Sequence, residues 1–309
     1  MALHASVLTY FDTVARLGSI RKAADRLNVA SSAINRQILK LEKYFGTQLF
    51  ERLPRGMRLT AAGEVLIRHI RSTLRDFNSV RADIGELTGA RKGIVTIASV
   101  EGMAAEFLPM IMSRFKKYHP GISFTVNIVT PDAVLLALRT NEADLGLMFN
   151  PPPQSGVKVV GNISLKIGAI MSPNHPLAKR KSVRMSECQV YPLILPDITL
   201  PNREWLNAML DDSDIISAPA ACSNSFQLMR ALAKYNFGIA FQTKVGIEEE
   251  IRTKKIVYVP LSDRRLKPSV LSILVRNHEL HAPASVFLKA VQEAVAELTY
   301  TTRTSSRAN

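Results

Sequence analysis

Small, polar and basic side chains recur at helical spacing along residues 31–45. Serine, asparagine and arginine side chains can hydrogen-bond the edges of DNA bases, and a helix that presents them fits the major groove. This stripe consists of Ser32, Asn35, Arg36, Leu39 and Lys43. The opposite stripe is apolar, as a helix packed on its own domain requires, and consists of Ile34, Ile38, Leu41 and Phe45. The segment therefore predicts a helix that reads DNA.

A second group of basic residues follows this helix. The segment 49–60 predicts a short β-hairpin, or wing, with Pro-Arg-Gly at its tip. Arginines on such a wing can hold phosphates or enter the minor groove. The residues that we expect to contact DNA are Arg21, Ser31, Ser32, Asn35, Arg36, Lys40, Arg52 and Arg55.

The charge of the chain points to the same partner. Its 309 residues carry a formal net charge of +14, which indicates a polyanion or a membrane surface as the partner. Residues 1–58 contain ten Lys or Arg against four Asp or Glu, a net charge of +6. We expect double-stranded DNA and no membrane, because no segment has the length and apolarity of a membrane span. A basic helical domain without a nucleic-acid role is the alternative.

Two further helices are expected to hold the polar stripe in place. An apolar pattern at helical spacing stops at Gly18, Ser19 can cap a second helix, and Asn28 begins a tight break before the third. Together with the wing, these elements predict an N-terminal, all-α winged helix-turn-helix domain over residues 1–59.

Residues 60–90 contain no proline, and Thr60 can cap them as one long linker helix. Apolar positions repeat along this segment in steps of four and three, which is typical of a coiled-coil seam that needs a partner helix. Thr73 is its weak position. The residues expected to form a dimer are Leu66, Ile70, Phe77, Val80 and Ile84. An amphipathic helix packed on its own chain is the alternative.

From Gly93 onward, apolar runs alternate with helical patterns, including a helix expected over 101–118. This alternation predicts an α/β fold with a parallel sheet covered on both faces. A triple proline at 151–153 and a return near 264–268 indicate two lobes joined by two crossings, which resembles a periplasmic-binding-protein fold. The expected parts are lobe I over 91–160 and 268–298, lobe II over 161–267 with a helix containing Trp205, and a disordered tail over 299–309.

Ligands in such folds lie in the crevice at the carboxyl ends of strands. The residues expected to bind an effector there are Ser99, Val100, Glu101, Gly102, Thr130, Asn150, Ile198, Thr199, Ser223, Asn224 and Phe226. Glu101 permits two interpretations, because a carboxylate at a helix N-terminus is usually a favourable cap. If it instead faces the crevice, it disfavours carboxylate effectors and favours an amine or a neutral polar molecule.

No pattern of an enzyme is present. The sequence has no G-x-S-x-G elbow, Walker loop or G-x-G-x-x-G fingerprint. His278 and His281 are three residues apart, which is not the H-E-x-x-H zinc spacing, and we expect them in a solvated loop. Cys188 and Cys222 are expected as buried thiols, with an oxidant-sensing Cys222 as the alternative. We therefore expect no catalytic residue, metal or cofactor.

The ordered motifs of the first 63 residues resemble the DNA-binding domain of the LysR-type transcriptional regulators. They are Phe11-x-x-Val14-Ala15-x-x-Gly18-Ser19, Ala23-Ala24-x-x-Leu27, Ala33-Ile34-x-Arg36-Gln37-Ile38, Leu49-Phe50-x-Arg52 and Leu59-Thr60-x-x-Gly63. Looser matches such as Asp144-Leu145-Gly146 and Gly238-Ile239-Ala240 extend the resemblance to about residue 298. Where the family commonly opens its recognition helix with Ser-Gln, this chain has Ala30-Ser31. The DNA sequence that this helix recognises is therefore expected to differ from the sequences that such family members recognise.

The resemblance implies a cytoplasmic transcription regulator whose activity a small-molecule effector changes. It also implies a palindromic promoter site and a homodimer that pairs into a tetramer, and it leaves RNA polymerase open as a further partner. Two other classes were considered. One is a solute-binding or catalytic protein with a basic appendage, which would bind DNA without sequence preference. The other is an architectural DNA-binding protein that ignores effectors.

Overall fold

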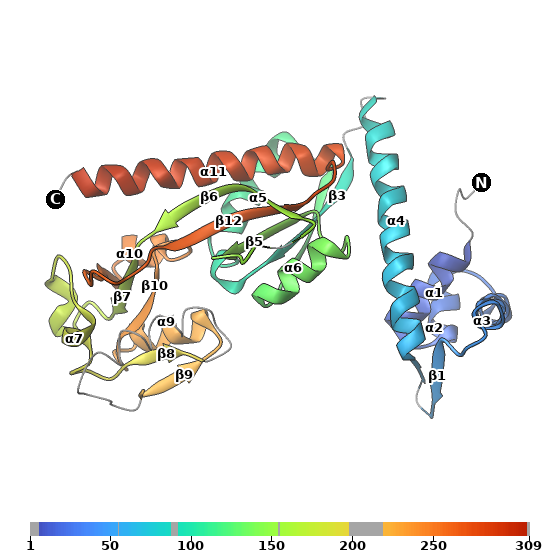
Figure 1. Cartoon of the computed structure of the whole chain (residues 1–309), viewed down its shortest axis with the longest axis horizontal. Helices are drawn as coiled ribbons and strands as arrows, with labels where there is room; N and C mark the ends of the chain where they lie inside the picture. The colour runs from blue at the N-terminus through green and yellow to red at the C-terminus, as the bar shows by residue number, and fades with distance from the viewer. Residues whose placement is uncertain (1–5, 55, 88–91, 154, 198–218, 308–309) are drawn as a thin grey trace. The chain divides into compact units, whose positions relative to one another are not determined.

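The computed structural model describes residues 6–54, 56–87, 92–153, 155–197 and 219–307 (Figure 1). The chain divides into two units, one of residues 1–93 with Thr140–Glu142 and one of the remaining residues. The first unit begins with the helices α1 (Ser6–Leu17), α2 (Ile20–Leu27) and α3 (Ser31–Phe45). Their buried side chains form one core and include Phe11, Val14, Ala23, Ala24, Ile34 and Ile38.

The breaks between these helices follow the expected chemistry. The Ser19 hydroxyl accepts a hydrogen bond from the Lys22 amide at 3.3 Å and caps α2. Asn28 ends α2 in the left-handed conformation with φ of 53°, which asparagine tolerates better than most residues. The turn between α2 and α3 is therefore built from the residues that the sequence indicated.

The wing is a two-stranded antiparallel hairpin of β1 (Phe50–Leu53) and β2 (Gly56–Leu59). The Glu42 carboxylate of α3 accepts hydrogen bonds from the Leu49 and Phe50 amides, at 2.9 and 3.3 Å. This side chain ties the start of the wing to the recognition helix. The expected hairpin is confirmed by the strand pairing.

The long helix α4 (Ala61–Leu87) begins at Thr60, whose hydroxyl accepts a hydrogen bond from the Gly63 amide at 3.1 Å. The first half of α4 differs from the expected dimer seam. Ile70 is completely buried in the core of the first unit, and Leu66 packs against the same core. These two side chains complete their own domain. Farther along α4, Val80 and Ile84 are half-exposed.

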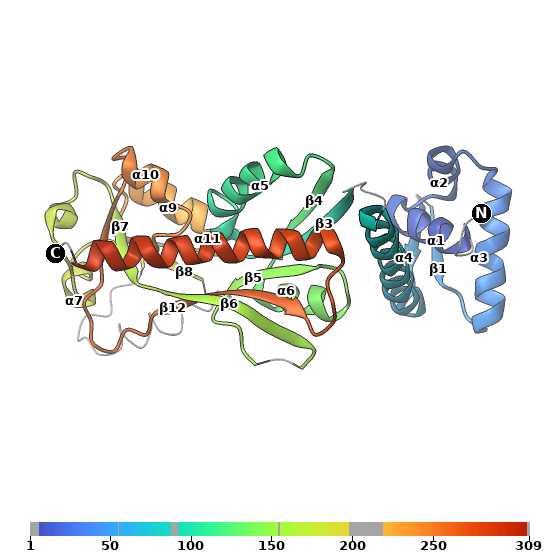
Figure 2. The same cartoon turned by 90° about the horizontal axis from the view of Figure 1, so that it is seen from above.

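Lobe I of the second unit is a five-stranded sheet in the order β4-β3-β5-β12-β6. Its strands are β3 (Gly93–Ser99), β4 (Ile122–Ile128), β5 (Leu145–Phe149), β6 (Val157–Leu165) and β12 (Ser269–Arg276). The helices α5 (Phe107–Tyr118) and α11 (Ala282–Arg307) share one core with this sheet, and α6 (Pro131–Arg139) packs in a separate core (Figure 2). Helices therefore cover both faces, as expected.

The expectation of a purely parallel sheet was wrong. β3 and β5 are parallel, but β12 runs antiparallel to both β5 and β6. β12 is the strand with which the chain returns from lobe II, so it enters the sheet from the opposite end. β6 stays in this sheet as far as Leu165, which puts the first crossing about five residues later than the expected boundary at residue 160.

Lobe II contains two smaller sheets, β10-β7-β11 and β8-β9. The strands are β7 (Ile167–Met171), β8 (Ile194–Pro196), β9 (Ala221–Ser223), β10 (Ala240–Thr243) and β11 (Val257–Pro260). The helices are η2 (Pro176–Lys179), α7 (Met185–Cys188), α9 (Phe226–Lys234) and α10 (Glu248–Arg252). The expected helix around Trp205 lies outside the described residues.

Two helices differ from their expected extents. The expected helix over 101–118 is broken into the 3₁₀ turn η1 (Glu101–Met103) and α5, which begins at Phe107. The last helix, α11, does not end near Leu298 but continues to Arg307. The expected disorder was therefore wrong for residues 299–307. This stretch is polar but contains no glycine or proline, so nothing in it stops a helix.

Candidate functional site

The exposed face of α3 gathers the side chains that could read DNA. Ser31, Ser32, Arg36 and Lys40 are exposed and Asn35 is half-buried, while Ile34 and Ile38 on the opposite face are buried. The face surrounds a shallow hollow of about 320 Å³, whose lining residues are Ser32, Asn35, Arg36, Leu39, Lys40 and Lys43. Donors, acceptors and positive charge thus lie together on one open helix surface.

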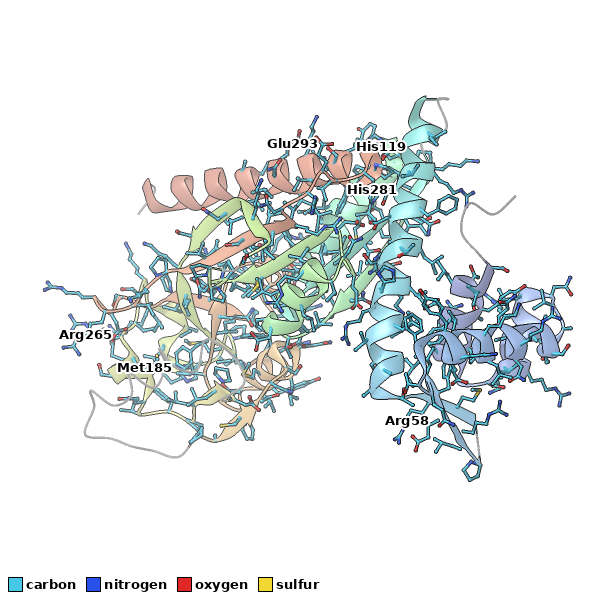
Figure 3. All side chains as sticks on the ribbon, turned by 45° about the vertical axis from the view of Figure 1, so that its right-hand side comes forward. Arg58, His119, Met185, Arg265, His281 and Glu293 are labelled. Carbon is cyan, nitrogen blue, oxygen red and sulfur yellow. The ribbon has the colours of Figure 1, made fainter. Side chains whose placement is uncertain are left out.

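The wing contributes to this face. The Arg52 guanidinium on β1 donates a hydrogen bond to the Asn35 side-chain oxygen at 3.1 Å, which fixes the orientation of the Asn35 amide. Arg58 on β2 pairs with Glu51 at 2.7 Å (Figure 3). Arg21 is exposed near the start of α2. Arg55, at the tip, lies outside the described residues.

One residue of the expected core stripe is misplaced. Phe45 is half-exposed at the end of α3 and contacts the ring of Tyr44, with the centroids 5.1 Å apart. Leu41 is only partly buried against the core. The last turn of α3 therefore extends beyond the body of the domain, which a periodic pattern alone does not reveal.

In the second unit, a cavity of about 340 Å³ is lined from lobe I and lobe II. The lining residues are Glu101, Gly102, Ala104, Ala105, Phe149, Phe226, Gln227, Arg230, Gln242, Thr243, Val245 and Ser269. Its volume lies within the range of small-molecule sites. The cavity is the candidate effector site.

The Glu101 side chain of lobe I forms hydrogen bonds with residues of lobe II. One carboxylate oxygen accepts from the Ser225 hydroxyl at 2.8 Å, and the other accepts from the Phe226 amide at 2.8 Å. A longer bond of 3.4 Å comes from the Gln227 amide. Glu101 lines the cavity, and it caps a different helix from the one at whose N-terminus it was expected. The helix is α9 of lobe II, so the carboxylate occupies the place where α9 could hold an external anion.

The other charges near the cavity are also paired. The Arg230 guanidinium forms an ion pair with Glu250 at 2.7 Å and donates to the Gly246 carbonyl at 2.9 Å. A second contact between the lobes involves Glu106, whose carboxylate accepts from the Glu249 amide at 3.1 Å.

Glu248 lies beside Glu106 on α10, where the residue as a whole is exposed. Desolvation of its carboxyl group and the hydrogen-bonded Glu106 carboxylate together raise the pKa of Glu248 to about 7, although hydrogen bonds from backbone amides oppose this shift. One oxygen of Glu248 accepts from the Gly246 and Ile247 amides, at 2.8 and 3.1 Å. The surroundings of Glu248 therefore favour its protonated form, in which it can donate a hydrogen bond to Glu106.

Of the expected effector residues, Glu101, Gly102 and Phe226 line the cavity. The others that the structure describes have different roles or positions. The fully buried Ser99 bonds the Val100 carbonyl at 3.2 Å, and Val100 itself packs against the lobe I cores. The Asn150 side chain accepts from the Val270 amide at 2.7 Å and so ties the end of β5 to β12.

Three further expectations are not met at the cavity. Thr130 and Asn224 are exposed and do not line it. Ser223 uses its hydroxyl to accept from the Ser225 amide at 3.0 Å. Ile198 and Thr199 lie outside the described residues.

Sequence reasoning missed Gln242, Thr243 and Ser269. All three are buried polar residues of the lining. Gln242 and Thr243 follow the apolar residues of β10, and such a change of polarity at the carboxyl end of a strand was a usable signal.

The remaining candidates carry no assigned chemistry. Cys188 is buried, which raises the pKa of its thiol to about 12, but Cys222 is exposed, contrary to expectation, and no disulfide joins them. His281, directly before α11, is not solvated, because it is buried and its Nε2 lies 3.2 Å from an Asp144 oxygen (Figure 3). Among the described residues, no three His, Cys, Asp or Glu side chains are grouped as metal ligands would be. No helix in the described part of the chain is long and apolar enough to cross a membrane.

A winged helix-turn-helix with an open basic face, followed in one chain by two α/β lobes around a cavity, defines a DNA-binding regulator with a sensor domain. The chain belongs to the LysR family of transcriptional regulators. Residues 6–64 match the bacterial regulatory helix-turn-helix protein, lysR family, and residues 88–296 match the LysR substrate binding domain. Members of this family are regulators and not enzymes.

The curated relatives align with most of this chain, but at low sequence identity. The transcriptional dual regulator GltC of Bacillus subtilis (strain 168) is 27% identical over 293 residues, which cover 94% of this chain and 97% of GltC. The RuBisCO operon transcriptional regulator of Allochromatium vinosum is 24% identical over 268 residues, 85% of this chain and 88% of that protein.

Two solved structures share the fold. Full-length CbnR complexed with its target DNA has a TM-score of 0.69 at 20% identity and covers 93% of this chain and 98% of CbnR. A full-length variant of OxyR from Pseudomonas aeruginosa has a TM-score of 0.70 at 17% identity and covers 96% of this chain and 95% of OxyR.

Proposed function

We propose that this regulator reads a palindromic promoter site as a homodimer, with one α3 helix in each half-site. The observation that carries the proposal is the open face of α3, where the wing residue Arg52 holds the Asn35 amide at 3.1 Å. Asparagine can bond adenine and arginine can bond guanine through paired hydrogen bonds. Arg21, Ser31, Ser32, Lys40 and Arg55 supply phosphate or groove contacts around this pair.

Selection of bound fragments from genomic DNA, followed by footprinting, tests the proposal. Arg36→Ala should abolish the specific footprint, because it removes a candidate base contact from the centre of the face. Arg68→Ala is the matched control, since Arg68 is exposed on α4, away from the α3 face, and carries the same charge. A footprint that survives Arg36→Ala, or wild-type binding without sequence preference, contradicts the proposal.

The dimer is proposed to form through the second half of α4. Val80 and Ile84 are 50% and 56% exposed there, and Phe77 lies one turn before Val80. Two copies of this surface would cover one another in an isologous contact. Pairing of two dimers into a tetramer, contact with RNA polymerase and a cytoplasmic location are proposed with it, from the family to which the chain belongs.

The effector is proposed to act by changing how the two lobes pack and thereby the spacing of the two DNA-binding domains. Such a change requires that the ligand bind one arrangement more tightly than the other. In this proposal, the DNA-binding domain comprises residues 1–59, the linker helix residues 60–90 and the effector-binding domain residues 91–298. An architectural DNA-binding protein would give the same footprint with and without a ligand in the cavity, so a ligand-dependent footprint separates the two functions.

A further inference from the structure

Three polar side chains line the cavity without a protein partner. Gln242, Thr243 and Ser269 are 9%, 7% and 2% exposed. Within the described part of the chain, none of their side chains forms a hydrogen bond. Their polar atoms are not among the buried side-chain atoms that lack a partner, so solvent in the cavity reaches them. A ligand in the cavity could therefore replace this solvent and form hydrogen bonds with all three side chains.

Among the described residues that line the cavity, the one cationic side chain is paired with a carboxylate, whereas the Glu101 carboxylate is bonded only by neutral donors. The Glu101 carboxylate receives three hydrogen bonds from Ser225, Phe226 and Gln227 at the N-terminus of α9. The Arg230 guanidinium is paired with Glu250 at 2.7 Å. An anionic ligand would have to displace Glu101 from the helix terminus and would lie beside its negative charge. A ligand without negative charge leaves the hydrogen bonds of Glu101 intact.

Apart from Gln227, the rest of the wall is apolar. Phe149 and Phe226 contribute aromatic rings, Val245 is buried, and Ala104 lies beside them. Apolar and aromatic walls favour a flat or apolar body, whereas a few polar groups fix its orientation. The buried polar side chains and the apolar walls thus describe two parts of one ligand.

We propose that the cavity takes a ligand without negative charge that has a flat apolar body and a hydrogen-bonding group, and that Glu101 excludes carboxylates by occupying the N-terminus of α9. This inference rests on the proposed effector function of the cavity and names the chemical class of the effector. Gln242, Thr243 and Ser269 bond the polar group of the ligand. Glu101 is a specificity-determining residue, because its own carboxylate takes the place that an anionic ligand would need.

Benzamide, benzoate and benzamidine test this proposal, because they share a ring and a planar group and are neutral, anionic and cationic. Ligand-observed NMR titrations of the full chain at millimolar concentrations measure their binding. Wild type should bind benzamide and benzamidine more tightly than benzoate, and Gln242→Ala should weaken benzamide binding. Absence of benzamide binding, or benzoate binding as tight as that of benzamide, overturns the proposal.

A variant that gains benzoate binding provides the stricter test. Glu101→Ala frees the α9 amides and should strengthen benzoate binding about tenfold, which is the size of one charge-assisted hydrogen bond. Glu106→Ala is the matched control, because it removes a lobe I carboxylate that bonds α10 but does not line the cavity. Benzoate binding that stays equal in wild type and Glu101→Ala overturns the role of Glu101.

The DNA footprint keeps the two proposals apart. If the ligand class is wrong, wild type still gives the specific footprint that Arg36→Ala loses. If the proposed regulation fails instead, benzamide binds the cavity while the footprint remains the same with and without it.

Discussion

Glu248 keeps its proton at a pH at which an ordinary glutamic acid is ionised. Burial raises its pKa to about 7 from an ordinary value of 4.5, and Glu106 adds a nearby negative charge. The protonated group can donate to Glu106 with one oxygen while the other accepts from Gly246 and Ile247. Since Glu106 belongs to lobe I and Glu248 to lobe II, the hydrogen bond formed by this proton links the two lobes.

We predict a pH-dependent stability that Glu248→Gln removes. Between about pH 4.5 and 7, the unfolded chain has lost this proton while the folded chain retains it, so stability falls as pH rises and then stays constant. Glutamine resembles the protonated acid, with one acceptor and one donor. The variant should therefore be more stable than wild type above pH 7, by about 2 kcal/mol after allowance for partial exposure.

Urea unfolding at a series of pH values measures this difference. Subtracting the two curves cancels the other titrating groups that are common to both proteins. Glu249→Gln is a suitable control, because Glu249 is an exposed neighbour paired with Arg252. A difference between wild type and Glu248→Gln that does not grow between pH 4.5 and 7 contradicts the protonated form of Glu248.

Single residues were predictable where their partners are close in sequence. Ser32, Asn35 and Arg36 lie on one helix, so the 3.6-residue period alone places them together. The partners of Glu101 are residues 225–227, more than 120 positions away. A local pattern could identify Glu101 as a cap but could not say which helix it caps. Asn150 misled the prediction for the same reason, because its partner is Val270.

At the scale of elements, the junction between the wing and α4 allows no side chain at Gly63. A methyl group there would collide with the Leu49 carbonyl oxygen and press on the Leu59 side chain. Alanine favours a helix over glycine by about 1 kcal/mol, but the backbone oxygen cannot move without disturbing the wing. We predict that Gly63→Ala destabilises the protein by about 2 kcal/mol or more.

Thermal unfolding followed by circular dichroism checks this prediction. Glu64→Ala serves as the neighbouring control, because Glu64 is exposed on the same helix turn and should change the melting temperature little. A Gly63→Ala protein as stable as wild type would show that the wing can shift away from α4.

The α4 helix shows what a repeat of apolar residues can and cannot predict. Its extent and its cap at Thr60 were predictable, because both depend on neighbouring residues. The heptad pattern could not say which apolar side chains face a partner and which face the same chain. Ile70 is completely buried in its own domain, whereas Val80 is half-exposed. One repeat thus serves two different contacts along a single helix.

We therefore predict that the dimer depends on the second half of α4. Val80→Ser should shift the dimer towards monomer in analytical ultracentrifugation, because it removes apolar area from the proposed contact. Val190→Ser is matched to it, since Val190 is 67% exposed in lobe II and belongs to the other unit of the chain. Equal association of the two variants would place the dimer contact elsewhere.

On the scale of the whole molecule, positive charge is concentrated in the N-terminal segment. Residues 1–58, less than a fifth of the chain, carry +6 of the formal net charge of +14. The arrangement of two lobes was predictable from the alternation of strands and helices. The antiparallel β12 was not, because the direction of a returning strand depends on where the chain has been in space and not on its own residues.

The number of DNA-binding domains on one site can be read from the salt dependence of binding. Each phosphate contact lowers the slope of log Kobs against log[salt] by about 0.9. Lys40 is exposed on the α3 face, and a homodimer on a palindrome presents it twice. We predict that Lys40→Ala makes the slope less negative by about 1.8, twice the value for one domain. Fluorescence anisotropy on the selected operator at several salt concentrations measures the slope. Lys181→Ala, which removes an exposed charge from lobe II, should leave it unchanged. A change near 0.9 would mean that only one α3 helix contacts the site, and no change would mean that Lys40 faces away from the phosphates.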